Sequence, residues 1–304
     1  MLVKLLMDYA NENNFTLDVN FKNTNEEFPL LFVVKNNNME MLTLLFDYAS
    51  ENNITLNINE KYVRQTPFID AIYKYNTEMI LLFIDYAKEK NFILDKWECK
   101  ELLKINISRE NNVILSSLIN YSIETGNELP IDINHITSIV IKNNIDMFKS
   151  LLYYLRKNYK QLSMNDMDTI FLNVVKTNNV ETVNLMLSFV NDINVILNIN
   201  VTVDSDYPLL VAIQHNNIQI FRLLFDYANE NNILMDINKK GNYGKYPISL
   251  ASENNNIEIV KFLKNYANEH KILLKYDIFD LSLETYNILN EKVIINCNTI
   301  VEQN

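Results

Sequence analysis

The chain has 304 residues, of which 48% are hydrophobic and 21% charged, and its formal net charge is −11. An acidic chain is poorly suited to nucleic acid, because affinity for phosphate comes from Lys and Arg. Only 3 glycines are present, which argues against glycine-rich phosphate-binding loops. No segment reaches the roughly 20 apolar residues of a membrane span. Asn is abundant, at 50 residues, and we attribute this excess to an AT-biased genome.

The cysteines and histidines form no pattern that favours chemistry. Cys99 and Cys297 are far apart and belong to no zinc-binding spacing. A reducing, intracellular compartment such as the cytoplasm is therefore expected. The 3 histidines are scattered, and none belongs to an HExxH or Ser/His/Asp arrangement. We predict that the protein is not an enzyme and has no cofactor, no metal and no catalytic residue.

A repeated segment extends along almost the whole chain. LLFDYASENNITLNIN (44–59) recurs as LLFDYANENNILMDIN (223–238), with weaker copies elsewhere. Each copy has one aromatic anchor, and these are Tyr9, Tyr48, Tyr86, Tyr121, Tyr154, Phe189, Tyr227 and Tyr266. This period predicts one array of about eight units over residues 1–280, with the first unit incomplete. Residues 276–304 are then a divergent C-terminal cap and tail.

Each unit predicts two helices and a short connecting finger. In the second unit, a proline and an apolar run predict a first helix over about 29–36. The run ends at consecutive Asn residues, which tolerate the left-handed conformation that ends a helix. Apolar residues at helical spacing predict a second helix over about 39–52. In the third unit, Thr66 is a suitable N-cap. One unit cannot bury its apolar face alone, so the units must stack.

These units resemble ankyrin repeats. The resemblance rests on a T-P-L-x-x-A block, an I-E-I-V-K-x-L block (257–263) and endings such as Asp236-Ile237-Asn238. It covers about residues 1–280 and is weak in the fourth to sixth units. The long, Asn-rich units are similar to ankyrin arrays of AT-rich lower eukaryotes such as anaerobic gut fungi. The resemblance implies an all-α solenoid of stacked helix-turn-helix units with short finger loops, and a non-catalytic role as a protein-binding scaffold or adaptor.

The chain departs from the family pattern at its glycines. The glycine between the two helices is replaced by Asn in most units. The glycine after the second helix is replaced by Ala49, Ala87, Ala228 and Ala267. Alanine is the better helix former by about 1 kcal/mol, so we expect the second helix to continue for about one further turn.

The tyrosines, the paired glycines and the single tryptophan are each explained by structure rather than by chemistry. The spacing of the tyrosines places them on second helices, packed between units. Gly241 and Gly244 fit a fingertip turn rather than a phosphate loop. Trp97, the only Trp, occupies the position of a finger Asn; it could be a binding hot spot, but filling a packing gap is the favoured explanation.

The resemblance implies a concave binding face built from fingers and the exposed ends of first helices. The candidate partner-binding residues carried over by position are Lys35, Tyr62, Arg64, Tyr73, Lys74, Gln214, His215, Lys239, Lys240, Tyr243 and Lys245. Several are basic, which hints at an acidic patch on the partner. The expected partner is another protein; we expect no nucleic acid, no membrane and no small-molecule substrate.

Three alternatives remain open. The chain begins at a second helix, so Leu2, Val3, Leu5 and Leu6 are expected to be partly uncovered. This array would then be the repeat segment of a larger protein whose activity lies in a missing domain, or another chain would cover this end. An enzyme hidden in units 98–200 would need a clustered polar pocket. The fold alternative is a HEAT-like array.

Overall fold

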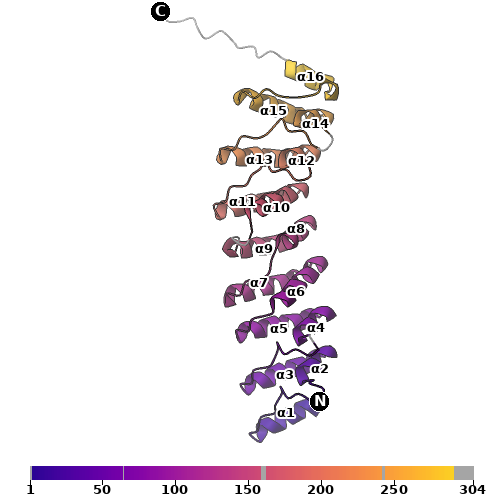
Figure 1. The fold of residues 1–304 in the computed structure, drawn as a ribbon, viewed down its shortest axis with the longest axis vertical. Helices are drawn as coiled ribbons and strands as arrows, with labels where there is room; N and C mark the ends of the chain where they lie inside the picture. Colours follow the sequence, from indigo (N-terminus) through magenta and orange to yellow (C-terminus); the bar gives the residue numbers. More distant parts are fainter. Residues whose placement is uncertain (1, 64, 159–161, 242–243, 291–304) are drawn as a thin grey trace, which may run out of the picture. The chain divides into compact units, whose positions relative to one another are not determined.

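A computed structural model describes residues 2–63, 65–158, 162–241 and 244–290. By its internal contacts the chain divides into two compact units, Met1–Gln161 and Leu162–Asn304. In both units the helices follow one another in pairs (Figure 1). The described part of the chain contains no β-strand, only two isolated bridges at finger turns, Tyr62 with Gln65 and Val203 with Asp206.

The first unit opens with a single helix and continues with four pairs. The single helix is α1 (Leu2–Glu12). The pairs are α2 (Pro29–Lys35) with α3 (Met39–Glu51), α4 (Pro67–Lys74) with α5 (Thr77–Glu89), α6 (Lys96–Arg109) with α7 (Asn112–Thr125), and α8 (Ile133–Ile141) with α9 (Ile145–Asn158). The first helices contact one another in a row, α2 to α8, and the second helices form a parallel row, α3 to α9.

The second unit contains three pairs and a terminal element. The pairs are α10 (Met164–Lys176) with α11 (Val180–Asp192), α12 (Pro208–Gln214) with α13 (Ile218–Glu230), and α14 (Pro247–Glu253) with α15 (Ile257–Glu269). The 3-10 helix η2 (Ile278–Asp280) and α16 (Leu283–Asn290) follow, against α14 and α15 respectively. Residues 276–290 of the predicted cap therefore continue the helical packing, while 291–304 lie outside the described residues. The division of the chain into array and cap stays a prediction.

Asparagine shapes the turns of both units. Within each pair, the residue that ends the turn between the helices has φ between +51° and +57°, and it is Asn37, Asn143, Asn178, Asn216 or Asn255 in five of the seven pairs. The next residue is Asn in every pair, and its side chain accepts a backbone N–H of the second helix. Genome bias is thus an incomplete explanation of the Asn content, because two successive positions use properties that suit Asn.

The second helices run past the alanines that replace glycine, but only by two residues. Ala49 lies inside α3, which ends at Glu51, and Ala228 lies inside α13, which ends at Glu230. A left-handed residue then reverses the chain, for example Asn53. The extension is real and shorter than the predicted turn, because these left-handed residues end it.

The aromatic anchors are buried, as predicted, and most of them also join adjacent repeats. The hydroxyl of each such tyrosine lies 2.8–3.0 Å from the backbone N of a residue after the preceding second helix. The pairs are Tyr48 with Leu17, Tyr86 with Leu56, Tyr121 with Leu94, Tyr154 with Leu129, Tyr227 with Leu197, and Tyr266 with Met235. Phe189 is buried without a hydroxyl, and Tyr9 is 58% exposed. Leu2, Val3, Leu5 and Leu6 of α1 are exposed as well, as predicted.

A second set of hydrogen bonds joins the fingers. The amide of Asn238 donates to the carbonyl of Leu273 at 2.9 Å and accepts the N–H of Lys275 at 2.8 Å. Asn200 makes the same two contacts with Leu234 and Asp236. Side-chain amides therefore replace the backbone ladder that neighbouring strands would supply.

Candidate functional site

The predicted residues of the first unit come together at the ends of α2 and α4. The Lys35 Nζ lies 4.0 Å from the centre of the Tyr62 ring, a cation–π contact between a first helix and the next finger. Tyr73 is 52% exposed and Lys74 follows it at the end of α4. Arg64 lies outside the described residues. This end of the row therefore presents Tyr73 and two lysines to solvent, beside a half-buried Tyr62.

The predicted residues of the second unit are more strongly engaged with their neighbours. Gln214 and His215 are exposed at the end of α12. Lys239 donates to the Thr202 hydroxyl, and Lys240 lies 3.4 Å from Asp277. Lys245 forms a 2.7 Å ion pair with Glu253. Tyr243 is outside the described part of the chain. Lys240 and Lys245 are thus paired with carboxylates and Lys239 with a neutral hydroxyl, contacts that the sequence did not reveal.

Trp97 does not occupy a finger. It lies in the first turn of α6, 54% exposed, directly after Asp95, whose carboxylate caps the helix by accepting the N–H groups of Trp97 and Glu98. The fourth repeat begins its first helix without a finger, so the position equivalent to Asn59 has become helical. Trp97 fills no gap in the interior.

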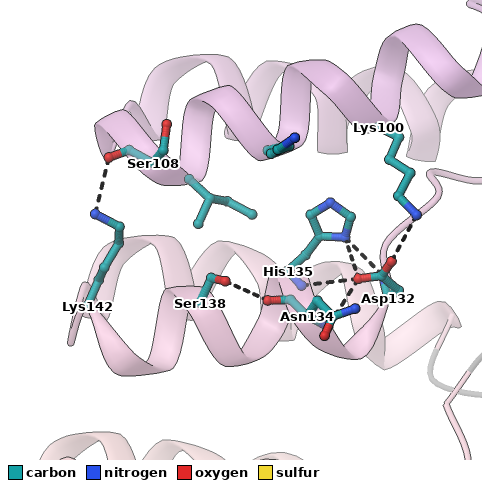
Figure 2. Close-up of a pocket in the computed structure, with 9 residues that line it drawn as sticks. Lys100, Ser108, Asp132, Asn134, His135, Ser138 and Lys142 are labelled. Carbon is teal, nitrogen blue, oxygen red and sulfur yellow. Dashed lines mark hydrogen bonds and ion pairs between the residues drawn. The ribbon is translucent and has the colours of Figure 1, made fainter.

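A polar pocket lies between α6 and α8, the first helices of adjacent repeats (Figure 2). Its volume is about 390 Å³. Its polar lining consists of Lys100, Lys104, Ser108, Asp132, Asn134, His135, Ser138 and Lys142, and Ile107 adds the apolar contact. Three lysines thus line one concavity of a chain that is acidic overall: Lys100 and Lys104 lie on α6, and Lys142 directly follows α8.

Asp132 organises one end of the pocket. It caps α8 by accepting the N–H groups of Asn134 and His135 at 3.1 and 3.2 Å. Its other oxygen lies 3.2 Å from the Lys100 Nζ. Burial acts to raise the Asp132 pKa, but the His135 backbone, the His135 ring and Lys100 together lower it below its ordinary value. Asp132 is therefore a fixed negative charge that neutralises Lys100.

His135 is held by the same carboxylate. Only 7% of the residue is exposed, and its Nδ1 lies 2.7 Å from Asp132 Oδ1 and 3.3 Å from the Asp132 backbone N. Burial lowers the His135 pKa, which outweighs the opposing effect of Asp132. In Figure 2 the ring stands between the two helices, with its second nitrogen directed away from Asp132.

Two cationic or donor groups in the pocket have no partner among the described residues. The Lys142 Nζ is engaged, 3.1 Å from both Glu110 and the Ser108 carbonyl. By contrast, Lys104 forms no ion pair, and nothing within the described ranges bonds to His135 Nε2. The pocket therefore retains one uncompensated positive charge and one free imidazole nitrogen.

The sequence analysis did not predict this pocket, although two of its residues align with positions that were predicted to bind a partner. Ser108 aligns with Lys35 and Tyr73, and Lys142 aligns with Lys74, when the Asn pairs of the repeats are superposed. The same row of first-helix positions was therefore predicted to bind a partner in the better-conserved units. Because the repeat pattern is weak in the fourth and fifth repeats, the continuation of this row was not recognised from the sequence.

Glu98 of α6 is a buried carboxylate that lies outside the pocket. Glu98 is 4% exposed; its Oε1 accepts the Thr66 hydroxyl, and its Oε2 has no partner. Burial raises the Glu98 pKa above its ordinary value, against the opposing effect of the Thr66 hydrogen bond. The neighbouring Cys99 is buried and free, and burial raises the pKa of its thiol to about 12. A thiol with that pKa is a weak nucleophile at neutral pH.

No group of His, Cys, Asp and Glu side chains within the described ranges could hold a metal ion. No helix among the same residues is both long and apolar enough to cross a bilayer.

One family model matches part of the chain. The family described as "Ankyrin repeats (3 copies)" matches residues 171–275. The ankyrin repeat domain of Bcl-3, titled a unique member of the IkappaB protein family, is 14% identical with a TM-score of 0.46, covering 77% of this chain and 98% of its own. The human ASB11 ankyrin repeat domain is also 14% identical, with a TM-score of 0.30, covering 81% and 86%. No curated protein matches the sequence.

Proposed function

Because this chain is an ankyrin-repeat protein, we propose that it is a non-catalytic scaffold or adaptor that binds another protein on its first helices and fingers. Ankyrin repeats are a general protein–protein interaction fold. The free cysteine, Cys99, fits an intracellular location such as the cytoplasm.

The observation that carries the proposal is the aromatic and basic group on α2, α4 and the finger between them, in which Lys35, Tyr73 and Lys74 are exposed and Tyr62 is half-buried. Tyr62 and Tyr73 are large, rigid side chains of the kind enriched at interfaces. Lys35 already contacts the Tyr62 ring at 4.0 Å, so part of the surface is ordered before a partner arrives. Preorganisation of this kind reduces the entropy lost on binding.

The test is affinity capture with three baits of the full chain. The first is the wild type, and the second carries Lys35→Ala, Tyr62→Ala and Tyr73→Ala. The third is a matched control with Tyr153→Ala and Lys261→Ala, which removes an exposed tyrosine and an exposed lysine from second helices. We expect a specific protein to be captured by the wild type and the control and lost from the second bait. Equal capture by all three baits contradicts the proposed surface.

A further inference from the structure

We propose that the pocket between α6 and α8 binds a carboxylate side chain, Asp or Glu, presented by the protein partner. This inference rests on the proposed function and assigns the chemistry of one part of the binding face. The walls of the pocket come from first helices and the residue that precedes α8, so the pocket opens along the row of first helices rather than along the second helices.

The charges of the pocket suit a single carboxylate. Lys100 is compensated by Asp132 at 3.2 Å, and Lys142 by Glu110 at 3.1 Å. Lys104 is the remaining cation, and its charge is not matched by any residue that the structure describes. One incoming carboxylate would therefore bring the local charge to balance. Charge-assisted hydrogen bonds of this type are stronger than neutral ones.

His135 supplies a second donor from the opposite helix. The residue is more than nine-tenths buried, its Nδ1 is held by Asp132, and its Nε2 is unpartnered within the described ranges. With Nδ1 against the Asp132 carboxylate, the imidazolium form also carries a proton on Nε2 and can donate it to an oxygen seated between the helices. A carboxylate would therefore bind Lys104 of α6 and the imidazolium of His135 on α8. The hydroxyls of Ser108 and Ser138 line the same space.

A single carboxylate fits better than a polyanion. The chain as a whole carries a net charge of −11, so its long-range field repels nucleic acid and densely charged ligands. Asp132 also lies inside the pocket and would oppose a second negative charge. An acidic side chain on a neutral or basic partner surface meets both conditions.

The experiment titrates the full chain with the peptide acetyl-Gly-Gly-Glu-Gly-Gly-amide, whose only charge is one side-chain carboxylate, and follows binding by NMR chemical shifts. The same peptide with Gln in place of Glu is the ligand control. Lys104→Ala removes the unpaired pocket cation, and Lys261→Ala removes an exposed lysine of α15 as the matched protein control. Both positions are exposed, so neither substitution should unfold the protein. We expect the glutamate peptide to bind and Lys104→Ala to weaken its affinity by about tenfold, while Lys261→Ala changes it less than twofold.

A second readout follows His135 directly. The chain has 3 histidines, so the variants His215→Gln and His270→Gln assign the His135 imidazole signals by NMR. A bound carboxylate stabilises the imidazolium form of His135, as Asp132 does, whereas Lys100 opposes it. The glutamate peptide should therefore raise the His135 pKa and leave the imidazole signals of His215 and His270 in place.

Several outcomes would overturn the inference. They are absence of binding of the glutamate peptide, equal binding of the glutamine peptide, unchanged affinity in Lys104→Ala, an equal loss in Lys261→Ala, or a His135 pKa that does not move. If a partner is captured through Tyr62 and Tyr73 while the glutamate peptide fails to bind, only the carboxylate pocket is wrong. If the capture experiment fails, the proposed binding face is wrong independently of the peptide result.

Discussion

The hydroxyl of Tyr86 accepts a 2.8 Å hydrogen bond from the backbone N–H of Leu56, 30 residues earlier and in the preceding repeat. Leu56 is buried, so water cannot replace this acceptor. The same contact recurs between five other tyrosines and the chain that precedes them. The repeated DYA sequence thus encodes a packing residue and an acceptor for a buried donor of the neighbouring repeat.

Removal of one such hydroxyl should weaken one repeat interface. We expect Tyr86→Phe to lower the free energy of unfolding by about 1–3 kcal/mol, because the Leu56 N–H is left buried without an acceptor. Hydrogen exchange of the Leu56 amide should accelerate accordingly. Tyr9→Phe is the control, since the Tyr9 side chain is mostly exposed, and it should change stability by less than about 0.5 kcal/mol. Equal effects of the two substitutions would show that the hydroxyl is energetically unimportant.

The buried Glu98 should make stability depend on pH. Its pKa in the folded protein lies above the ordinary value of 4.5, so the folded state keeps a proton that the unfolded chain releases. Stability therefore falls as the pH rises from about 4.5 through the folded pKa, and the loss persists at pH 7. Glu98→Gln should be more stable than the wild type at pH 7 and lose this advantage below about pH 4.

This pH effect can be measured by urea unfolding followed through Trp97, the only Trp, which lies on the same helix as Glu98. Glu12→Gln removes an exposed carboxylate and should show no comparable change with pH. A wild type whose stability rises between pH 4 and 7 relative to Glu98→Gln would contradict the argument.

The left-handed asparagines should accept glycine and resist alanine. Asn255 has φ of 52° and an exposed side chain, so substitution there tests backbone conformation alone. Asn255→Ala should destabilise by about 1–2 kcal/mol, because a Cβ disfavours the left-handed region. Asn255→Gly should lie within about 0.5 kcal/mol of the wild type, because glycine adopts this conformation freely. Thermal unfolding followed by circular dichroism distinguishes the two; equal losses would remove φ as the reason for Asn.

The side-chain hydrogen bonds that join neighbouring fingers, here called the finger ladder, require an amide rather than a carboxylate. Asn238→Asp keeps an acceptor for the Lys275 N–H but replaces the donor to the Leu273 carbonyl with a negatively charged oxygen. A loss of about 1–3 kcal/mol is expected. Asn265→Asp makes the same change on the exposed side of α15 and serves as the reference for added charge. If both variants unfold at the same urea concentration, the ladder contributes little.

The sequence predicted the repeat, its helix pairs and the burial of the tyrosines because these depend on local periodicity. The Asn turns were also predictable, since left-handed φ and N-capping are local properties. The partners of the Tyr86 hydroxyl and of the Asn238 amide were not, because they lie in the adjacent repeat. The α6–α8 pocket was missed for the same reason: Lys104 and His135 meet only after two first helices pack.

The tyrosine hydrogen bonds have a direction. In the six contacts between a tyrosine hydroxyl and a backbone N–H, the donor is the main chain of the earlier repeat and the acceptor is the side chain of the later one. Deletion of repeats from the C-terminal side would strip the acceptor from a buried N–H such as that of Met235. Deletion from the N-terminal side would instead free a hydroxyl, which water can satisfy, as at the exposed Tyr9. Deletion of N-terminal repeats should therefore reduce the stability of the remaining array far less than deletion of C-terminal repeats.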